Sequence, residues 1–75
     1  MYYFVMKYQF PEKLKELRLE RNLSTRQLAN ALNNRITKTT ICNWEAGITI
    51  PNFESVIIIA EYFGVTTDYF AGKEY

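Results

Sequence analysis

The chain has 75 residues, of which 48% are apolar and 23% are charged, and its formal net charge is +1. This length allows one small domain, and the composition excludes a disordered or fibrous protein. One cysteine and no histidine exclude an internal disulfide, the usual zinc sites and Ser-His or Cys-His catalytic pairs, so we expect no metal, no cofactor and no enzyme. No apolar run approaches the roughly 20 residues of a membrane span, which makes the cytoplasm the expected location.

The charge is distributed unevenly along the chain. Residues 1–38 contain eight Lys or Arg against three Glu, a net charge of +5. Residues 39–75 contain one Lys against five acidic residues, a net charge of −4. A molecule of this kind can offer its basic side to phosphates and its acidic side to other contacts.

Residues 1–10 (MYYFVMKYQF) are rich in apolar and aromatic side chains and contain no acidic one. Their β-favouring content predicts an extended segment or a short strand. We expect the aromatic side chains to cover the helical domain or to pair with a second chain, rather than to stack on nucleic acid. The chain is therefore divided into an N-terminal aromatic segment, residues 1–10, and a helical domain, residues 11–75.

The first helix is predicted to begin at Pro11, which suits a first helical turn, and to continue to about Arg21. Asn22 then fits the left-handed position that follows a helix. The inward residues of this helix follow helical spacing: Phe10, Leu14 and Leu17.

Two short helices follow. Ser24 or Thr25 caps the second helix, and a polar turn at residues 33–35 separates it from the third. Thr37 caps the third helix and Gly47 ends it. The side chains of this pair that are predicted to face the core are Leu28, Ala29, Leu32, Ile41 and Trp44.

The remaining residues predict a longer helix and a short one. Asn52 caps the fourth helix and Gly64 ends it. Thr66 or Thr67 caps a last helix over residues 68–71. The side chains of the fourth helix that are predicted to share its inward face are Phe53, Val56, Ile57, Ala60 and Phe63.

Ile58 and Tyr62 lie one turn apart and off the inward face of the fourth helix, so we expect an exposed pair. Such a pair is either ordinary surface or, together with the N-terminal aromatic residues, a dimer patch.

Five helices joined by short turns predict a compact all-α domain. The second and third helices make a helix-turn-helix, whose second member can enter the major groove of DNA. On a helical wheel, Ile41 and Trp44 of the third helix face the core, and Lys38 leads from its N-terminus. The outward side chains are small and uncharged: Thr39, Cys42, Asn43 and Ala46.

Five stretches of the chain carry a family resemblance: Leu17-Arg18, Leu23 to Ala29 (LSTRQLA), Thr40 to Gly47 (TICNWEAG), Pro51, and Gly64 to Tyr69 (GVTTDY). In this order and spacing they resemble the phage-repressor family of helix-turn-helix proteins, also described as lambda-repressor-like, Cro-type or XRE. The resemblance runs from residue 14 to residue 72. It implies a five-helix domain that binds DNA as a dimer and regulates transcription, often in bacteria and their phages.

The resemblance also implies roles for particular residues. It places base reading at Lys38, Thr39 and Asn43. A Lys can donate to guanine, an Asn can pair bidentately with adenine, and the Thr methyl can contact a thymine methyl, so these residue types suit the task.

Phosphate contacts are implied at Thr25, Thr37, Thr40 and the backbone near Ala46, and such contacts set the register on the duplex rather than the sequence choice. The resemblance further pairs an arginine of the first helix with the glutamate that ends the third, here Arg18 with Glu45. The position of Arg18, four residues after the inward Leu14, supports this pair.

Three departures from the family pattern affect the expected affinity. Thr25 stands where the family commonly has a longer Gln. The turn over residues 33–36 is about two residues longer than usual and could tilt the third helix, although Arg35 could add a phosphate contact. The connection over residues 48–50 replaces a segment that is often basic. Because each lost phosphate contact weakens binding at every sequence, we expect modest non-specific affinity.

The leading functional hypothesis is a sequence-specific regulator of transcription, a repressor, that binds a palindromic operator in double-stranded DNA as a homodimer. Its expected place is the nucleoid in the cytoplasm, with no membrane and no small-molecule ligand. The alternative is a protein-interaction module of the same fold, such as an antirepressor or a partner-controlling subunit, with little affinity for DNA.

Overall fold

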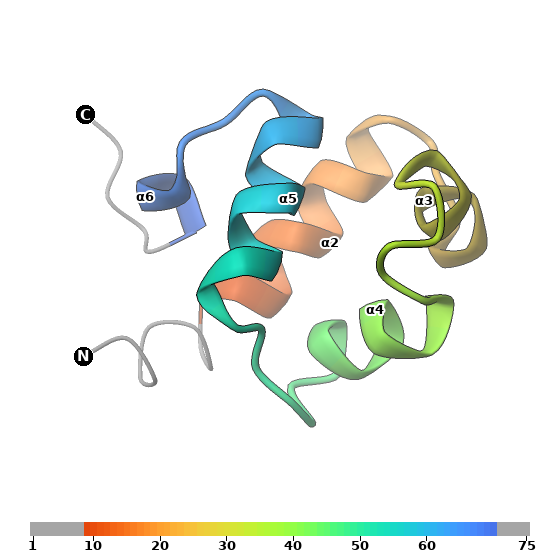
Figure 1. The fold of residues 1–75 in the computed structure, drawn as a ribbon, viewed down its shortest axis with the longest axis horizontal. Coiled ribbons are helices and arrows are strands. Elements are labelled where there is room, and N and C mark those ends of the chain that lie inside the picture. The colour runs from red at the N-terminus through yellow and green to blue at the C-terminus, as the bar shows by residue number, and fades with distance from the viewer. Residues whose placement is uncertain (1–8, 71–75) are drawn as a thin grey trace.

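The computed structural model describes residues 9–70, which contain five helices and no strand (Figure 1). The helices are α2 (Phe10–Glu20), α3 (Thr25–Ala31), α4 (Lys38–Glu45), α5 (Phe53–Phe63) and α6 (Thr67–Phe70). The expected all-α, five-helix fold is confirmed. Helix α2 begins at Phe10, one residue before the predicted start. The extended segment or strand predicted for residues 1–10 lies, up to residue 8, outside the described residues, as does the predicted end of the last helix at residues 71–72.

Short polar side chains begin four of the helices. The Ser24 hydroxyl accepts a hydrogen bond from the Gln27 N–H (3.0 Å), and the Gln27 side chain accepts one from the Ser24 N–H (2.8 Å), which is a complete capping box. Thr37 and Asn52 cap α4 and α5 in the same manner. The Thr66 hydroxyl accepts a hydrogen bond from the N–H of Tyr69 (3.3 Å). Of the alternatives that the sequence left open, the capping residues are therefore Ser24 rather than Thr25, and Thr66 rather than Thr67.

Left-handed residues end the helices where the sequence predicts them. Asn22 (φ 57°) follows α2, Gly47 (φ 74°) follows α4 and Gly64 (φ 71°) follows α5. The turn after α3 contains two consecutive left-handed residues, Asn33 (φ 57°) and Asn34 (φ 59°). Asparagine is among the few non-glycine side chains that adopt this conformation readily, so the two residues give the turn its shape.

The core lies where α2 contacts α4 and α6, and α5 packs against α6 (Figure 1). Phe10 is at its centre: its ring meets Trp44 of α4 edge-on at 5.6 Å and Phe70 of α6 at 4.9 Å, centroid to centroid. Aromatic pairs of this geometry add to the free energy gained by burial alone. The apolar residues buried among 9–70 are Phe10, Leu14, Leu17, Leu28, Ala29, Leu32, Ile36, Ile41, Trp44, Val56, Ile59, Ala60, Phe63 and Phe70.

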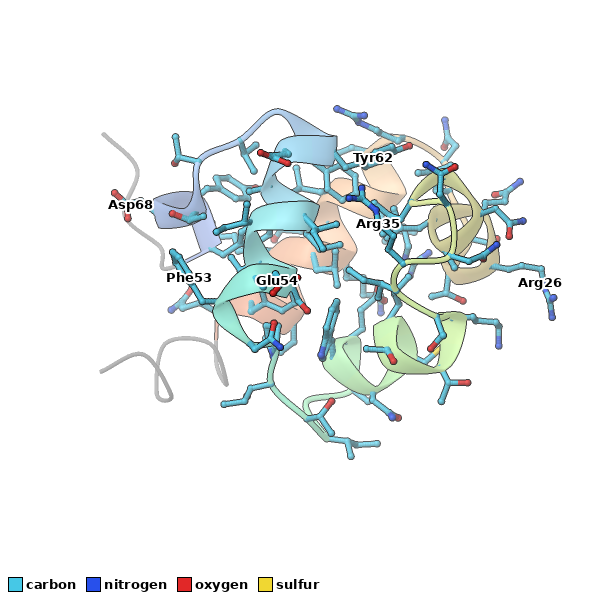
Figure 2. All side chains as sticks on the ribbon, viewed as in Figure 1. Arg26, Arg35, Phe53, Glu54, Tyr62 and Asp68 are labelled. Carbon is cyan, nitrogen blue, oxygen red and sulfur yellow. The ribbon has the colours of Figure 1, made fainter. Side chains whose placement is uncertain are left out.

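The predicted inward face of α5 is wrong at two positions. The Phe53 side chain is 60% exposed, and Figure 2 shows it pointing outward from the start of α5. Pro51, which precedes the helix, is buried. Ile59 is fully buried, whereas Ile57 is only half-buried. The buried stripe therefore follows the spacing of Val56, Ile59, Ala60 and Phe63, at i, i+3, i+4 and i+7.

Ile58 and Tyr62 are less exposed than the sequence predicts. Both side chains are half-buried and pack against the core. The Tyr62 ring meets Phe63 edge-on at 5.0 Å, and the Arg21 guanidinium lies 5.4 Å from the Tyr62 ring centroid. Each of the two side chains thus has part of its surface left for an external contact.

Because Phe10 joins α2, α4 and α6, we predict that Phe10→Ala lowers the free energy of unfolding by about 3–5 kcal/mol through loss of burial and the cavity left behind. Urea titration followed by the fluorescence of Trp44 measures the change. Leu19→Ala on the same helix is the control: Leu19 is 53% exposed, so its change should stay within about 0.5 kcal/mol. Equal effects of the two substitutions would contradict the central place of Phe10.

Candidate nucleic-acid interface

Helices α3 and α4 and the turn between them form the helix-turn-helix. The two helices pack against each other on one side of the molecule, and α6 lies on the opposite side (Figure 1). Ala29, a small residue of α3 that is predicted to face the core, is buried. Ile41 and Trp44 hold the inner face of α4, with exposures of 0% and 4%. The inner half of α4 is therefore fully used in packing.

The outer half of α4 is on the surface. Lys38 and Thr39 are exposed, and Asn43 is half-buried. No described residue accepts or donates a hydrogen bond at the Asn43 side-chain amide, whereas its backbone carbonyl accepts one from the Ile48 N–H (2.9 Å). The structure thus brings the three predicted base-reading residues onto one helix with their polar groups unused by the fold.

The predicted phosphate-contacting residues are more varied in their surroundings. Thr25 and Thr40 are half-buried, while Thr37 is exposed. The Thr37 and Thr40 hydroxyls are hydrogen-bonded to each other (2.9 Å), and Thr37 also accepts from the Thr40 N–H. One hydroxyl of this linked pair remains accessible as a donor at the start of α4.

The backbone after α4 is less available than the sequence implies. Ala46 is exposed, but its N–H donates to the Cys42 carbonyl (3.0 Å), and the N–H groups of Gly47 and Ile48 donate to carbonyls of α4. A phosphate that binds near Ala46 would have to share these N–H groups with the carbonyls of α4. Ile48, in the connection that follows, is 71% exposed and supplies no charge.

Arg18 and Glu45 form a two-pronged ion pair between α2 and the end of α4. The Arg18 Nε donates to one carboxylate oxygen of Glu45 (2.7 Å) and a terminal nitrogen donates to the other (2.8 Å). The remaining terminal nitrogen donates to the Leu23 carbonyl (2.7 Å), in the link between α2 and α3. The side chains are only 11% and 10% exposed. The Glu45 hydrogen bond raises the pKa of Arg18 above its ordinary value, although burial opposes the shift.

The charge of the helix-turn-helix is entirely basic outside this pair. From residue 24 to residue 44 the charged side chains are Arg26, Arg35 and Lys38, and all three are exposed. The Arg35 Nε donates to the Leu32 carbonyl (3.2 Å), so this side chain is folded back on the end of α3. The family resemblance implies no role for Arg26, although its position in the first turn of a helix without a nearby acidic residue is a signal visible in the sequence.

Other kinds of site find no support in the described part of the chain. Residues 9–70 contain no group of three or more His, Cys, Asp or Glu placed to hold a metal ion. None of the helices described is both long and apolar enough to cross a bilayer.

Comparison with known proteins agrees with the helix-turn-helix fold. The helix-turn-helix family matches residues 14–70. Similar curated proteins include the HTH-type transcriptional activator BcrR of Enterococcus faecalis, 43% identical over 60 residues, and the cryptic phage CTXphi transcriptional repressor RstR of Vibrio cholerae, 34% identical over 56 residues. The chain belongs to the helix-turn-helix family of the XRE type, a family of DNA-binding transcriptional regulators.

The two relatives are longer than the part that matches. The aligned regions cover 80% and 75% of this chain but only 28% of BcrR and 49% of RstR. No solved structure matches the chain.

Because Glu45 and Arg18 are nearly buried, we predict that Arg18→Met strands the carboxylate and lowers the free energy of unfolding by about 3 kcal/mol. Arg18→Lys keeps the charge but loses the paired hydrogen bonds, so its loss should be intermediate. The double variant Arg18→Met/Glu45→Leu removes both charges and should recover most of the stability. Urea unfolding measures all three, with exposed Lys15→Gln of the same helix as control. A double variant as unstable as Arg18→Met would contradict a compensated pair.

Proposed function

We propose that this chain is a sequence-specific regulator of transcription, acting as a repressor in the cytoplasm on nucleoid DNA, and that α4 reads the major groove of double-stranded DNA. The observation that carries the proposal is the two-sided character of α4. Ile41 and Trp44 are buried behind it, while Lys38 and Thr39 are exposed and Asn43 is partly exposed in front. The major groove is wide enough for one α-helix, and its base edges are the polar surface that such a face fits.

The three outward residues offer complementary kinds of base contact. The Lys38 ammonium donates to guanine acceptors, and the Asn43 amide can donate to and accept from adenine at once. The Thr39 methyl suits the thymine methyl group. The free side-chain amide of Asn43 supports its role, because no internal hydrogen bond has to break before it meets a base.

In this proposal, contacts with the phosphates of the DNA backbone set the register of α4 on the duplex. The hydroxyls of Thr25, Thr37 and Thr40, the terminal nitrogens of Arg35 and the backbone near Ala46 are the proposed partners of phosphates. Neutral hydroxyls release no counterions. The affinity for unrelated sequences should therefore be modest and set mainly by the cationic side chains.

We further propose that two copies bind a palindromic operator. The two-fold symmetry of a homodimer matches half-sites about 34 Å apart, one helical turn of DNA. Ile58 and Tyr62 remain the proposed contact between copies, although their partial burial limits the area that each supplies.

A protein partner is the second candidate function. Ile48 and Phe53 are 71% and 60% exposed, and they lie just after α4 and at the start of α5. Exposed apolar side chains of this size favour a protein contact over a phosphate contact. Tight binding to a protein, combined with DNA affinity that does not fall with salt, would favour this candidate over the first.

We predict that Asn43→Ala relaxes sequence preference at one position of each half-site, because a bidentate base contact contributes about 1–3 kcal/mol of discrimination. Selection of binding sites from random duplexes, carried out with the unaltered chain and with the variant, measures the preference. Asn30→Ala, an exposed asparagine in α3, is the matched control and should select the same site as the unaltered chain. An identical selected site for Asn43→Ala would show that the assigned reading face is wrong.

We predict that two chains bind each selected duplex. Inserting about half a helical turn between the half-sites moves them to opposite sides of the duplex and should weaken binding roughly a hundredfold, through loss of simultaneous engagement. Titration followed by native gel mobility measures both stoichiometry and affinity, and the same insertion outside the site is the control. One chain per duplex, with no effect of the insertion, would contradict the dimer.

A further inference from the structure

Arg26 is an exposed cation that the fold does not use. It is the second residue of α3, and no described residue forms an ion pair or a hydrogen bond with its side chain. The residues three and four positions away are Asn22, Leu23, Ala29 and Asn30, so no carboxylate stands at helical spacing to neutralise it. Its guanidinium is therefore available to a partner outside the chain.

Among the side chains near the start of α3, Arg26 is the long one that makes no hydrogen bond within the described structure. The Gln27 side chain is occupied by the capping box with Ser24. Thr25 is short and half-buried. Arg35, the other arginine of the helix-turn-helix, already donates its Nε to the Leu32 carbonyl. Of these side chains, Arg26 alone is both charged and without a bond to the rest of the described structure.

Arg26 projects outward from the side of the molecule that carries α3 and α4. Figure 2 shows it extending from α3 away from the body of the molecule, on the side opposite to Phe53 and Asp68. Helix α3 packs directly on α4. When the second helix of such a pair lies in the major groove, the first crosses the sugar-phosphate backbone. A side chain that projects from α3 therefore meets phosphate rather than base edges.

We propose that Arg26 binds a backbone phosphate of the duplex that α4 reads. This inference rests on the proposed function. The planar guanidinium donates two parallel hydrogen bonds to phosphate oxygens, which suits arginine to this contact better than a hydroxyl such as that of Thr25. The contact adds affinity at every DNA sequence and leaves the choice of sequence to α4.

The test measures how the affinity of the full chain depends on salt. The probes are a duplex carrying the selected site and an unrelated duplex of equal length, titrated from about 50 to about 200 mM salt. For each bound chain, Arg26→Gln should reduce the slope of log K against log salt by about 0.9 and weaken binding to both duplexes about eightfold near 0.1 M salt. Arg26→Lys keeps the charge and should keep the slope, with a smaller loss of affinity.

Lys15→Gln is the matched control, since it removes one exposed positive charge from α2, outside the helix-turn-helix. Its slope should equal that of the unaltered chain. If Arg26→Gln also keeps that slope, the Arg26 contact is overturned while the proposed function stands. If Arg26→Gln changes the preference between the two duplexes, Arg26 reads a base and the inference is equally overturned. Failure of the unaltered chain to bind any duplex overturns the proposed function itself.

Discussion

The orientation of α4 depends on one guanidinium that holds three parts of the chain together. Arg18 bonds both carboxylate oxygens of Glu45 at the end of α4 and the carbonyl of Leu23 at the entry to α3. An isolated helix of eight residues is not stable in water, because too few hydrogen bonds offset the cost of ordering it. The direction of α4 is therefore set from outside: the Arg18–Glu45 pair fixes its end, and Ile41 and Trp44 fix its inner side.

The aromatic contacts at the core extend this constraint to the rest of the domain. Trp44 lies directly before Glu45 and meets Phe10, which in turn meets Phe70 of α6. The ion pair of Glu45 with Arg18 and the aromatic contact of Trp44 with Phe10 thus hold neighbouring residues of one helical turn. The ion pair lies at the edge of the core, and the aromatic contact lies inside it. Because the inner side of α4 is held in both ways, its outer side can consist of small polar residues that contribute little to packing.

The features that the sequence predicted correctly are those that depend on interactions between residues close together in the chain. The caps at Ser24, Thr37 and Asn52 and the left-handed stops at Asn22 and Gly64 depend on side chains within a few residues, so the ends of the helices followed from the sequence. Burial in α5 could not be predicted in the same way. Helical spacing allowed Phe53 a place in the core, but Phe53 lies at the start of α5 and is exposed, and spacing says nothing about the path of the loop that leads into a helix.

The candidate site shows the same division. The residue types on the outer face of α4 were visible in the sequence, and the family resemblance implied the Arg18–Glu45 pair, which the structure contains. What the sequence could not predict was which polar groups the fold already uses. The N–H of Ala46 is bonded to the Cys42 carbonyl, and the Arg35 side chain to that of Leu32, whereas Arg26 is left unbonded in the described structure. The two sides of α4 are under different constraints. Under the proposed function, changes at the exposed positions 38 and 39 after a gene duplication would give each copy its own target, while both copies keep the same buried scaffold.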